Sequence, residues 1–153
     1  MAGYFEVTVE DGFSACHSVL LPGGSYEPPH VHEWRVWVTF RAATLNEAGF
    51  VVDFVEAQAA LRQVCGELDG GDLNAHTRFA TGASAERVAH WLAERMATLV
   101  GESARVHRVS VTEAAGCVAA YYPEDAGTRG RGEVTSNVSA WGGVSNSASD
   151  FGF

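Results

Sequence analysis

The chain has 153 residues, of which 46% are hydrophobic and 19% are charged, a composition typical of one globular domain. The formal net charge is −9 and every basic residue is an arginine, which argues against a nucleic-acid partner and excludes a Schiff-base lysine. No apolar run approaches the roughly 20 residues of a membrane-spanning helix, and the first residues lack the pattern of a signal peptide. We therefore expect a cytoplasmic protein that acts on a small molecule, with no membrane partner.

Two long strands are expected in the first part of the chain. Residues 4–10 alternate polar and apolar side chains, and the alternation resumes after an expected turn at residues 11–12. His17 then falls on the apolar face of this strand. A loop rich in Gly and Pro over residues 21–29 leads to a second strand, expected over about residues 31–43.

The second strand carries a His-x-His pair. His30, His32 and Trp34 share one parity with the apolar residues that follow, and alternate side chains of a strand point to the same face. Both histidines are therefore expected to face one site.

Two helices and two further strands follow. Residues 50–52 predict a short strand that leads into a helix capped by Asp53, with Glu56 three residues later as in a capping box. This helix is expected to stop at Gly70-Gly71, and a second helix to run from a cap at Ser84 to Gly101.

The last expected strands cover residues 105–113 and 117–122. The order β, β, α, α, β, β predicts an α+β fold, an antiparallel sheet with two helices on one face. We expect one domain over residues 1–123 and a flexible tail rich in Gly and Ser over residues 124–153. The cysteines are odd in number and lie in apolar segments, so they are expected to be reduced and buried.

His17, His30 and His32 form the strongest candidate site. Catalytic zinc commonly uses three protein ligands and keeps one position open, whereas structural zinc fills its coordination with Cys and His. The alternative is that they are ordinary polar side chains on half-buried strands. Because the three occur together with no cysteine in the pair, we favour a working metal site.

Six short motifs follow one another along the chain: Phe13-Ser-Ala-Cys-His17, His30-Val-His32-Glu-Trp34, Gly49-Phe-Val-Val-Asp-Phe54, Leu68-Asp-Gly-Gly-Asp-Leu-Asn74, Ser84-Ala-Glu86 and Val109-Ser-Val-Thr-Glu113. In this order they resemble the 6-pyruvoyl-tetrahydropterin synthase and 6-carboxy-tetrahydropterin synthase family, and the resemblance covers about residues 4–122. The resemblance implies the tunnelling fold, subunits assembled as trimers or hexamers, and active sites at subunit boundaries. It also implies Zn²⁺ on the three histidines and Glu113 as the anchor of a pterin-like ring.

Two departures from the family concern its proton-transfer residues. Tyr26 occupies the place of the reactive cysteine, and Gly70 follows Asp69 where the family has a histidine. Glu27 is the candidate base in the same loop, if burial raises its pKa toward neutrality, with Asp69 as its polar partner. His76 is the candidate replacement for the missing histidine.

The resemblance therefore predicts a zinc-dependent carbon–oxygen lyase or cyclase. The alternatives are a cyclase repurposed for specialised biosynthesis and a non-catalytic member that binds a pterin-like ligand. Gly24 and the His-x-His pair also fit the start of a cupin motif, but residues 36 and 37 lack the glutamate that this motif needs. A cupin would also need more strands and no pair of long helices.

Overall fold

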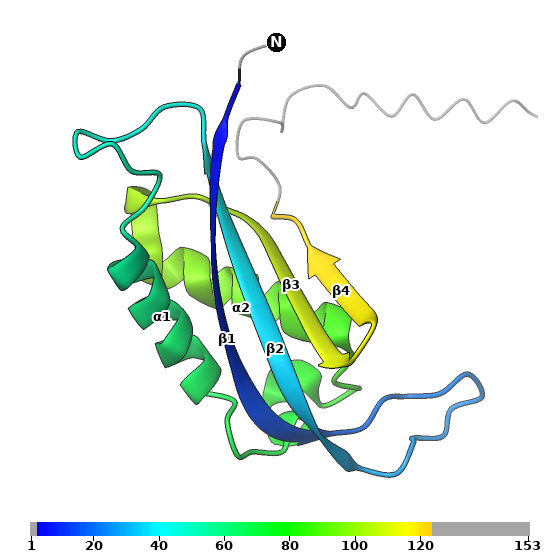
Figure 1. The fold of residues 1–153 in the computed structure, drawn as a ribbon. Helices are drawn as coiled ribbons and strands as arrows, with labels where there is room; N and C mark the ends of the chain where they lie inside the picture. Colours follow the sequence, from blue (N-terminus) through cyan, green and yellow to red (C-terminus); the bar gives the residue numbers. More distant parts are fainter. Residues whose placement is uncertain (1–2, 124–153) are drawn as a thin grey trace, which may run out of the picture. The chain divides into compact units, whose positions relative to one another are not determined.

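The structure is a computed structural model, which describes residues 3–123. Its centre is a four-stranded antiparallel sheet in the order β1-β2-β3-β4 (Figure 1), formed by β1 (Phe5–His17), β2 (His30–Ala42), β3 (Val106–Ala114) and β4 (Cys117–Tyr121). The expected tail over residues 124–153 lies outside the described residues.

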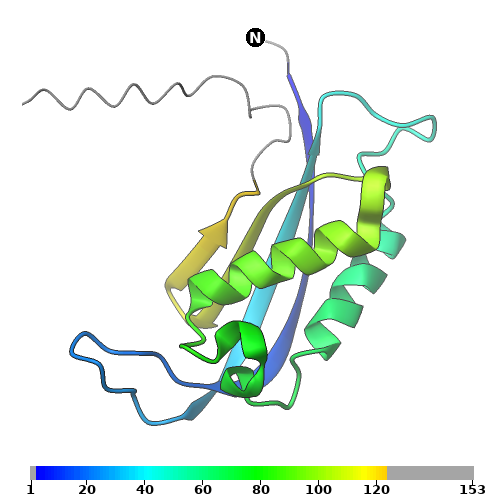
Figure 2. The same ribbon diagram turned by 180° about the vertical axis from the view of Figure 1, so that it is seen from behind.

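Two helices, α1 (Phe54–Gly66) and α2 (Ala85–Val100), cover one face of the sheet, as Figure 2 shows from behind. Two short 3-10 turns, Leu73–Ala75 and Thr77–Phe79, lie between α1 and α2, and a third, Gly101–Ser103, lies between α2 and β3. The α+β class and the β, β, α, α, β, β order are thus confirmed. Neither helix in the described chain is long and apolar enough to cross a membrane.

The first strand corrects one expectation, because β1 runs without a turn through residues 11–12. A Cβ at Gly12 would lie 2.5 Å from the carbonyl oxygen of Trp34. The glycine therefore permits a close approach of β1 to β2, which the sequence pattern does not distinguish from a turn.

The start of α1 corrects a second expectation, because residues 50–52 form no strand. Val51 and Val52 are buried in a bend, so their apolar side chains belong to the core. Asp53 caps α1 as expected, and its Oδ1 accepts a hydrogen bond from the amide of Val55 at 2.7 Å. The helix ends at Gly66, earlier than expected.

The core lies between the helices and the sheet. The shared parity on β2 buries Trp34, Val36, Val38 and Phe40. Leu61 of α1 and Leu92 of α2 are fully buried in the same cluster.

Replacing Leu92 by alanine is expected to lower the free energy of unfolding by about 2–5 kcal/mol, because it leaves a cavity at a fully buried position. Leu99 of the same helix is 36% exposed, so Leu99→Ala is the matched control and should cost less than about 1 kcal/mol. Urea unfolding followed by circular dichroism measures both. Equal losses would contradict this packing.

The cysteines also depart from expectation. Cys65 is buried in α1, and burial raises the pKa of its thiol to about 12. Cys16 is half-buried and Cys117 is exposed at the start of the edge strand β4. All three thiols are free, but the expected burial holds for Cys65 alone.

Candidate metal and ligand site

Strand register brings the three histidines together at one end of the β1–β2 pair. His17 lies opposite His30, and the small side chain of Ala15 lies opposite His32. The ring centroid of His17 lies 4.7 Å from that of His30 and 5.2 Å from that of His32. One nitrogen of each ring can be chosen so that all three lie within 4.8 Å of one another.

The end of β1 is held in place by the segment between the helices. Asn74 accepts from the amide of Ser18 at 2.8 Å and donates to its carbonyl oxygen at 3.0 Å. The amide of Ala83 also donates to the carbonyl oxygen of Ser18, at 3.3 Å. These bonds fix the backbone next to His17.

Backbone acceptors orient two of the imidazole rings. Nδ1 of His17 donates to the carbonyl oxygen of Ala83 at 2.8 Å, and Nδ1 of His30 donates to that of Pro28 at 2.9 Å. A proton on Nδ1 leaves the lone pair on Nε2, as in histidines that bind a metal through Nε2. The outer contacts of a metal-binding histidine are therefore present.

The most unusual atom of the site is Nε2 of His17. The side chain is fully buried, and Nε2 has no hydrogen-bond partner among the described residues. Oε2 of Glu113, also buried and unpartnered, lies 3.4 Å away. Because two acceptors do not stabilise each other, this pair calls for a cation or a donor between or beside them.

The donor set fits zinc. Imidazole nitrogen suits Zn²⁺, and three histidines leave one position of a tetrahedron open. Ligand nitrogens at about 2.0–2.1 Å from zinc lie roughly 3.4 Å apart. His30 and His32, which are half-buried, are the rings with room to rotate toward this spacing.

Glu113 links the histidines to a pocket of about 640 Å³. It lies in β3 where the β3–β4 register shifts between Val111 and Ala114, an irregularity of the kind often found beside active sites. The pocket also takes residues from the β3–β4 hairpin and from the start of α2, including Glu86.

Sequence reasoning assigned no role to Glu86, although it quoted the motif that contains it. The side chain of Ser84 accepts from the amide of Arg87 and so fixes the first turn of α2. Glu86 lies in that turn and lines the same pocket as Glu113. The signal available in the sequence was an acidic residue in the first turn of a helix, two residues after its cap.

The structure places Glu27 beside the histidines. Its Oε1 lies 3.8 Å from Nε2 of His30 and accepts from the amide of Val19 at 3.1 Å. The amide of Glu27 donates to the carbonyl oxygen of Val19, also at 3.1 Å. The loop between β1 and β2 is therefore held so that its carboxylate faces the site.

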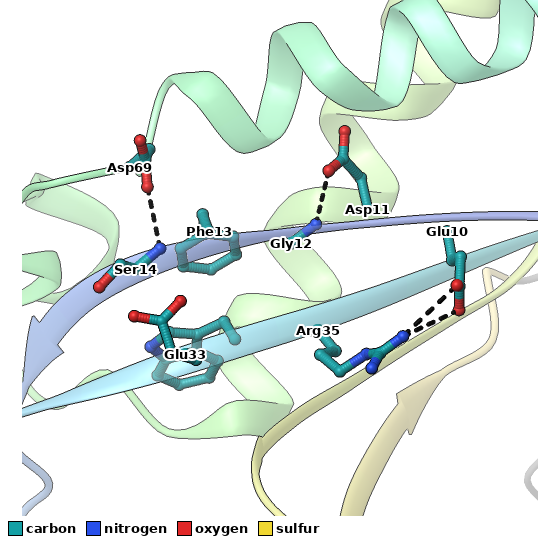
Figure 3. A pocket seen from close by; sticks show the side chains of 9 residues that line it. Glu10, Asp11, Gly12, Phe13, Ser14, Glu33, Arg35 and Asp69 are labelled. Carbon is teal, nitrogen blue, oxygen red and sulfur yellow. Dashed lines mark hydrogen bonds and ion pairs between the residues drawn. The ribbon is translucent and has the colours of Figure 1, made fainter.

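Asp69 lies elsewhere. Its Oδ1 accepts from the amide of Ser14 at 2.9 Å (Figure 3). The amide of Gly70 donates to the carbonyl oxygen of Ser14 at 2.7 Å. Asp69 lines a second pocket, of about 540 Å³, with Glu33 and Arg35. Within the described chain, this second pocket includes none of the three histidines and not Glu113.

The structure also describes Gly70 and Tyr26, which replace the proton-transfer residues expected from the resemblance. Gly70 has φ of +72°, a backbone conformation that a histidine adopts only with strain. Tyr26 is half exposed in the β1–β2 loop. His76 does not join the histidine cluster, because its ring packs against Phe79 and Trp91 and its Nδ1 accepts from the amide of Arg78.

Comparisons with known proteins agree with this fold. A family model described as 6-pyruvoyl tetrahydropterin synthase matches residues 6–124. The structure of 6-pyruvoyl tetrahydropterin synthase from Caenorhabditis elegans is similar, with 18% identity, a TM-score of 0.68 and coverage of 80% of this chain and 97% of that one. None of the curated proteins matches the sequence.

Two further structures have the same fold. The 6-pyruvoyl tetrahydropterin synthase of Plasmodium vivax is 17% identical, with a TM-score of 0.69 and coverage of 80% and 99% of the two chains. An uncharacterized protein from Wolinella succinogenes is 16% identical, with a TM-score of 0.62 and coverage of 79% and 99%. Two other structures of the Plasmodium vivax enzyme are described as mutants of a catalytic residue, a glutamate changed to alanine or cysteine. With the family model spanning all four strands and both helices, this chain belongs to the 6-pyruvoyl tetrahydropterin synthase family.

Proposed function

We propose that the protein is a zinc-dependent lyase or cyclase that acts on a pterin-like small molecule. The observation that carries the proposal is the buried, unpartnered Nε2 of His17, which faces Oε2 of Glu113 at the edge of a pocket. His17, His30 and His32 would hold the metal, and Glu113 would hold the ring.

The proposed roles follow from the chemistry of these groups. When bound, Zn²⁺ supplies polarisation of a substrate hydroxyl or carbonyl oxygen, which acidifies the neighbouring C–H bond. Glu113 can accept hydrogen bonds from a ring N–H and an exocyclic amino group. Glu27 takes the proton from carbon. The Plasmodium vivax enzyme, in which a glutamate is described as a catalytic residue, supports a carboxylate in this role.

Asp69 is proposed to act across a subunit boundary. It lines a different pocket from Glu113 within one chain, and the family resemblance implies homo-oligomers, trimers or hexamers, whose active sites form between subunits. A neighbouring copy would then supply Asp69 as the polar partner of Glu27.

A repurposed cyclase of the same site is the second candidate. The positive φ of Gly70 favours glycine over the histidine of the family, and Tyr26 replaces the cysteine. A protein without this histidine and cysteine can still catalyse a reaction that needs a single base, such as Glu27. A non-catalytic pterin-binding member would lack turnover altogether.

The test is a panel of dihydroneopterin triphosphate, dihydroneopterin and sepiapterin, followed by ultraviolet spectra and calorimetry on the zinc-loaded protein. For each ligand that binds, Glu113→Gln is expected to weaken binding by about 10- to 100-fold, because one acceptor oxygen becomes an NH₂ donor. Glu102→Gln, at an exposed carboxylate of the 3-10 turn Gly101–Ser103 that lines neither pocket, is the matched control and should bind as the unaltered protein does.

Conversion of a pterin supports the lyase or cyclase. Binding without conversion supports the non-catalytic candidate. If no pterin binds, or if Glu113→Gln binds as well as the unaltered protein, the proposed ring site is wrong.

A further inference from the structure

The backbone of residues 17–19 connects two groups that the proposed function uses. His17 is the fully buried candidate metal ligand. Val19 holds Glu27 by two bonds of 3.1 Å, because its amide donates to Oε1 of Glu27 and its carbonyl oxygen accepts from the Glu27 amide. Ser18 lies between them and is buried. The position of Ser18 therefore sets the positions of the imidazole ring and of the carboxylate together.

Ser18 follows the last residue of β1, and the side chain of Asn74 takes the place of a strand partner there. Oδ1 of Asn74 accepts from the Ser18 amide at 2.8 Å, and Nδ2 donates to the Ser18 carbonyl oxygen at 3.0 Å. An amide side chain carries an acceptor and donors, as a backbone peptide does, whereas an ionised aspartate carries acceptors only. Both bonds therefore need the asparagine.

Asn74 also reaches the segment that orients the His17 ring. Its Nδ2 donates a second, longer bond of 3.5 Å to the carbonyl oxygen of Phe79. The carbonyl oxygen of Ser18 accepts from the amide of Ala83 at 3.3 Å, and the carbonyl oxygen of Ala83 accepts from Nδ1 of His17 at 2.8 Å. All of these bonds lie within one chain, so they do not depend on a neighbouring copy.

From these contacts we infer that Asn74 is a positioning residue, which holds Ser18 so that the ring of His17 and the carboxylate of Glu27 keep their places in the site. The inference rests on the proposed function, which gives those two residues their roles. Without the side chain of Asn74, the buried backbone of Ser18 loses two bonds, and unpaired backbone groups favour a shift toward water. His17 and Val19 would then move with it.

The first test measures the zinc affinity of the full chain by competition with a coloured chelator. Asn74→Ala should weaken zinc binding by about tenfold, the lower end of the range for loss of an outer contact, because it acts through Ser18 and Ala83. Asn46→Ala is the matched control and should leave the affinity unchanged. Asn46 also accepts from two backbone amides, those of Ala48 and Phe50, but it lies beyond the end of β2 opposite to the histidines.

Hydrogen exchange of the zinc-free chain, followed by NMR, separates positioning from a general loss of stability. In Asn74→Ala the amides of Ser18, Val19 and Glu27 should exchange about tenfold faster, as expected for local opening after the loss of a hydrogen bond. Amides within α1 should keep their rates. A uniform increase throughout the described fold would show that Asn74 only stabilises the protein, and would overturn the inference.

The unaltered protein gives a test that does not depend on whether a variant folds. Its Ser18, Val19 and Glu27 amides should be protected and should open together, and unrelated rates for the three would contradict the inference. Equal zinc affinities of Asn74→Ala and Asn46→Ala would overturn the inference and leave the proposed function standing. An unaltered protein that binds no zinc would overturn the proposed function itself.

Discussion

Replacing His32 by alanine is expected to abolish stoichiometric zinc binding while the fold remains intact. Loss of an outer-shell partner of a metal ligand already weakens zinc binding by roughly 10- to 100-fold, and loss of a ligand itself should exceed that. His32 is half-buried, and its ring contacts are with His17, His30 and Trp34. The free energy of unfolding should therefore change by less than about 1 kcal/mol.

Metal analysis after dialysis against zinc and then against buffer measures the first effect, and urea unfolding measures the second. His90→Ala is the control, because His90 is a half-buried histidine on α2 that lies outside the cluster. It should retain one zinc per chain. A His32→Ala protein that holds as much zinc as His90→Ala would remove the metal site from consideration.

Replacing Glu27 by glutamine is expected to lower the turnover number by about 10²- to 10⁴-fold, the contribution usual for a general base. Glutamine keeps an oxygen that can accept from the amide of Val19, so the loop should hold its position. Zinc content should stay at the value of the unaltered protein. Initial rates with the pterin that is converted, together with metal analysis, measure both quantities.

The matched control for this variant is Glu102→Gln. Glu102 is an exposed carboxylate in the 3-10 turn Gly101–Ser103, and it lines neither the pocket of Glu113 nor that of Asp69. Its removal should change the rate by less than about twofold. The assignment of Glu27 as base fails if Glu27→Gln keeps more than half of the rate, or if the loss of rate follows a loss of zinc.

Local patterns were enough to predict most of the fold. The alternation on β2 set the common face of His30, His32 and the buried side chains after them, because a strand repeats every two residues. Asp53 and Ser84 marked the starts of both helices, because a cap satisfies amides within three residues of itself. Such signals depend only on near neighbours in the chain.

Local patterns failed where a distant backbone approaches. Gly12 indicated a turn, but the structure gives another reason for the glycine. A Cβ at this position would lie only 2.5 Å from the carbonyl oxygen of Trp34, so a larger residue would not fit. Val51 and Val52 indicated a strand because a buried bend and a buried strand have the same composition.

The sequence by itself determined the α+β order and the family, and it supplied the candidate site residues. Only the tertiary structure decided which of them meet. The register of β1 on β2 set His17 opposite His30, the carbonyl oxygen of Ala83 fixed the ring that faces Glu113, and Asp69 came to lie in another pocket. The reason is physical: strand register and loop placement are set by contacts between residues far apart in the chain, which no short sequence pattern records.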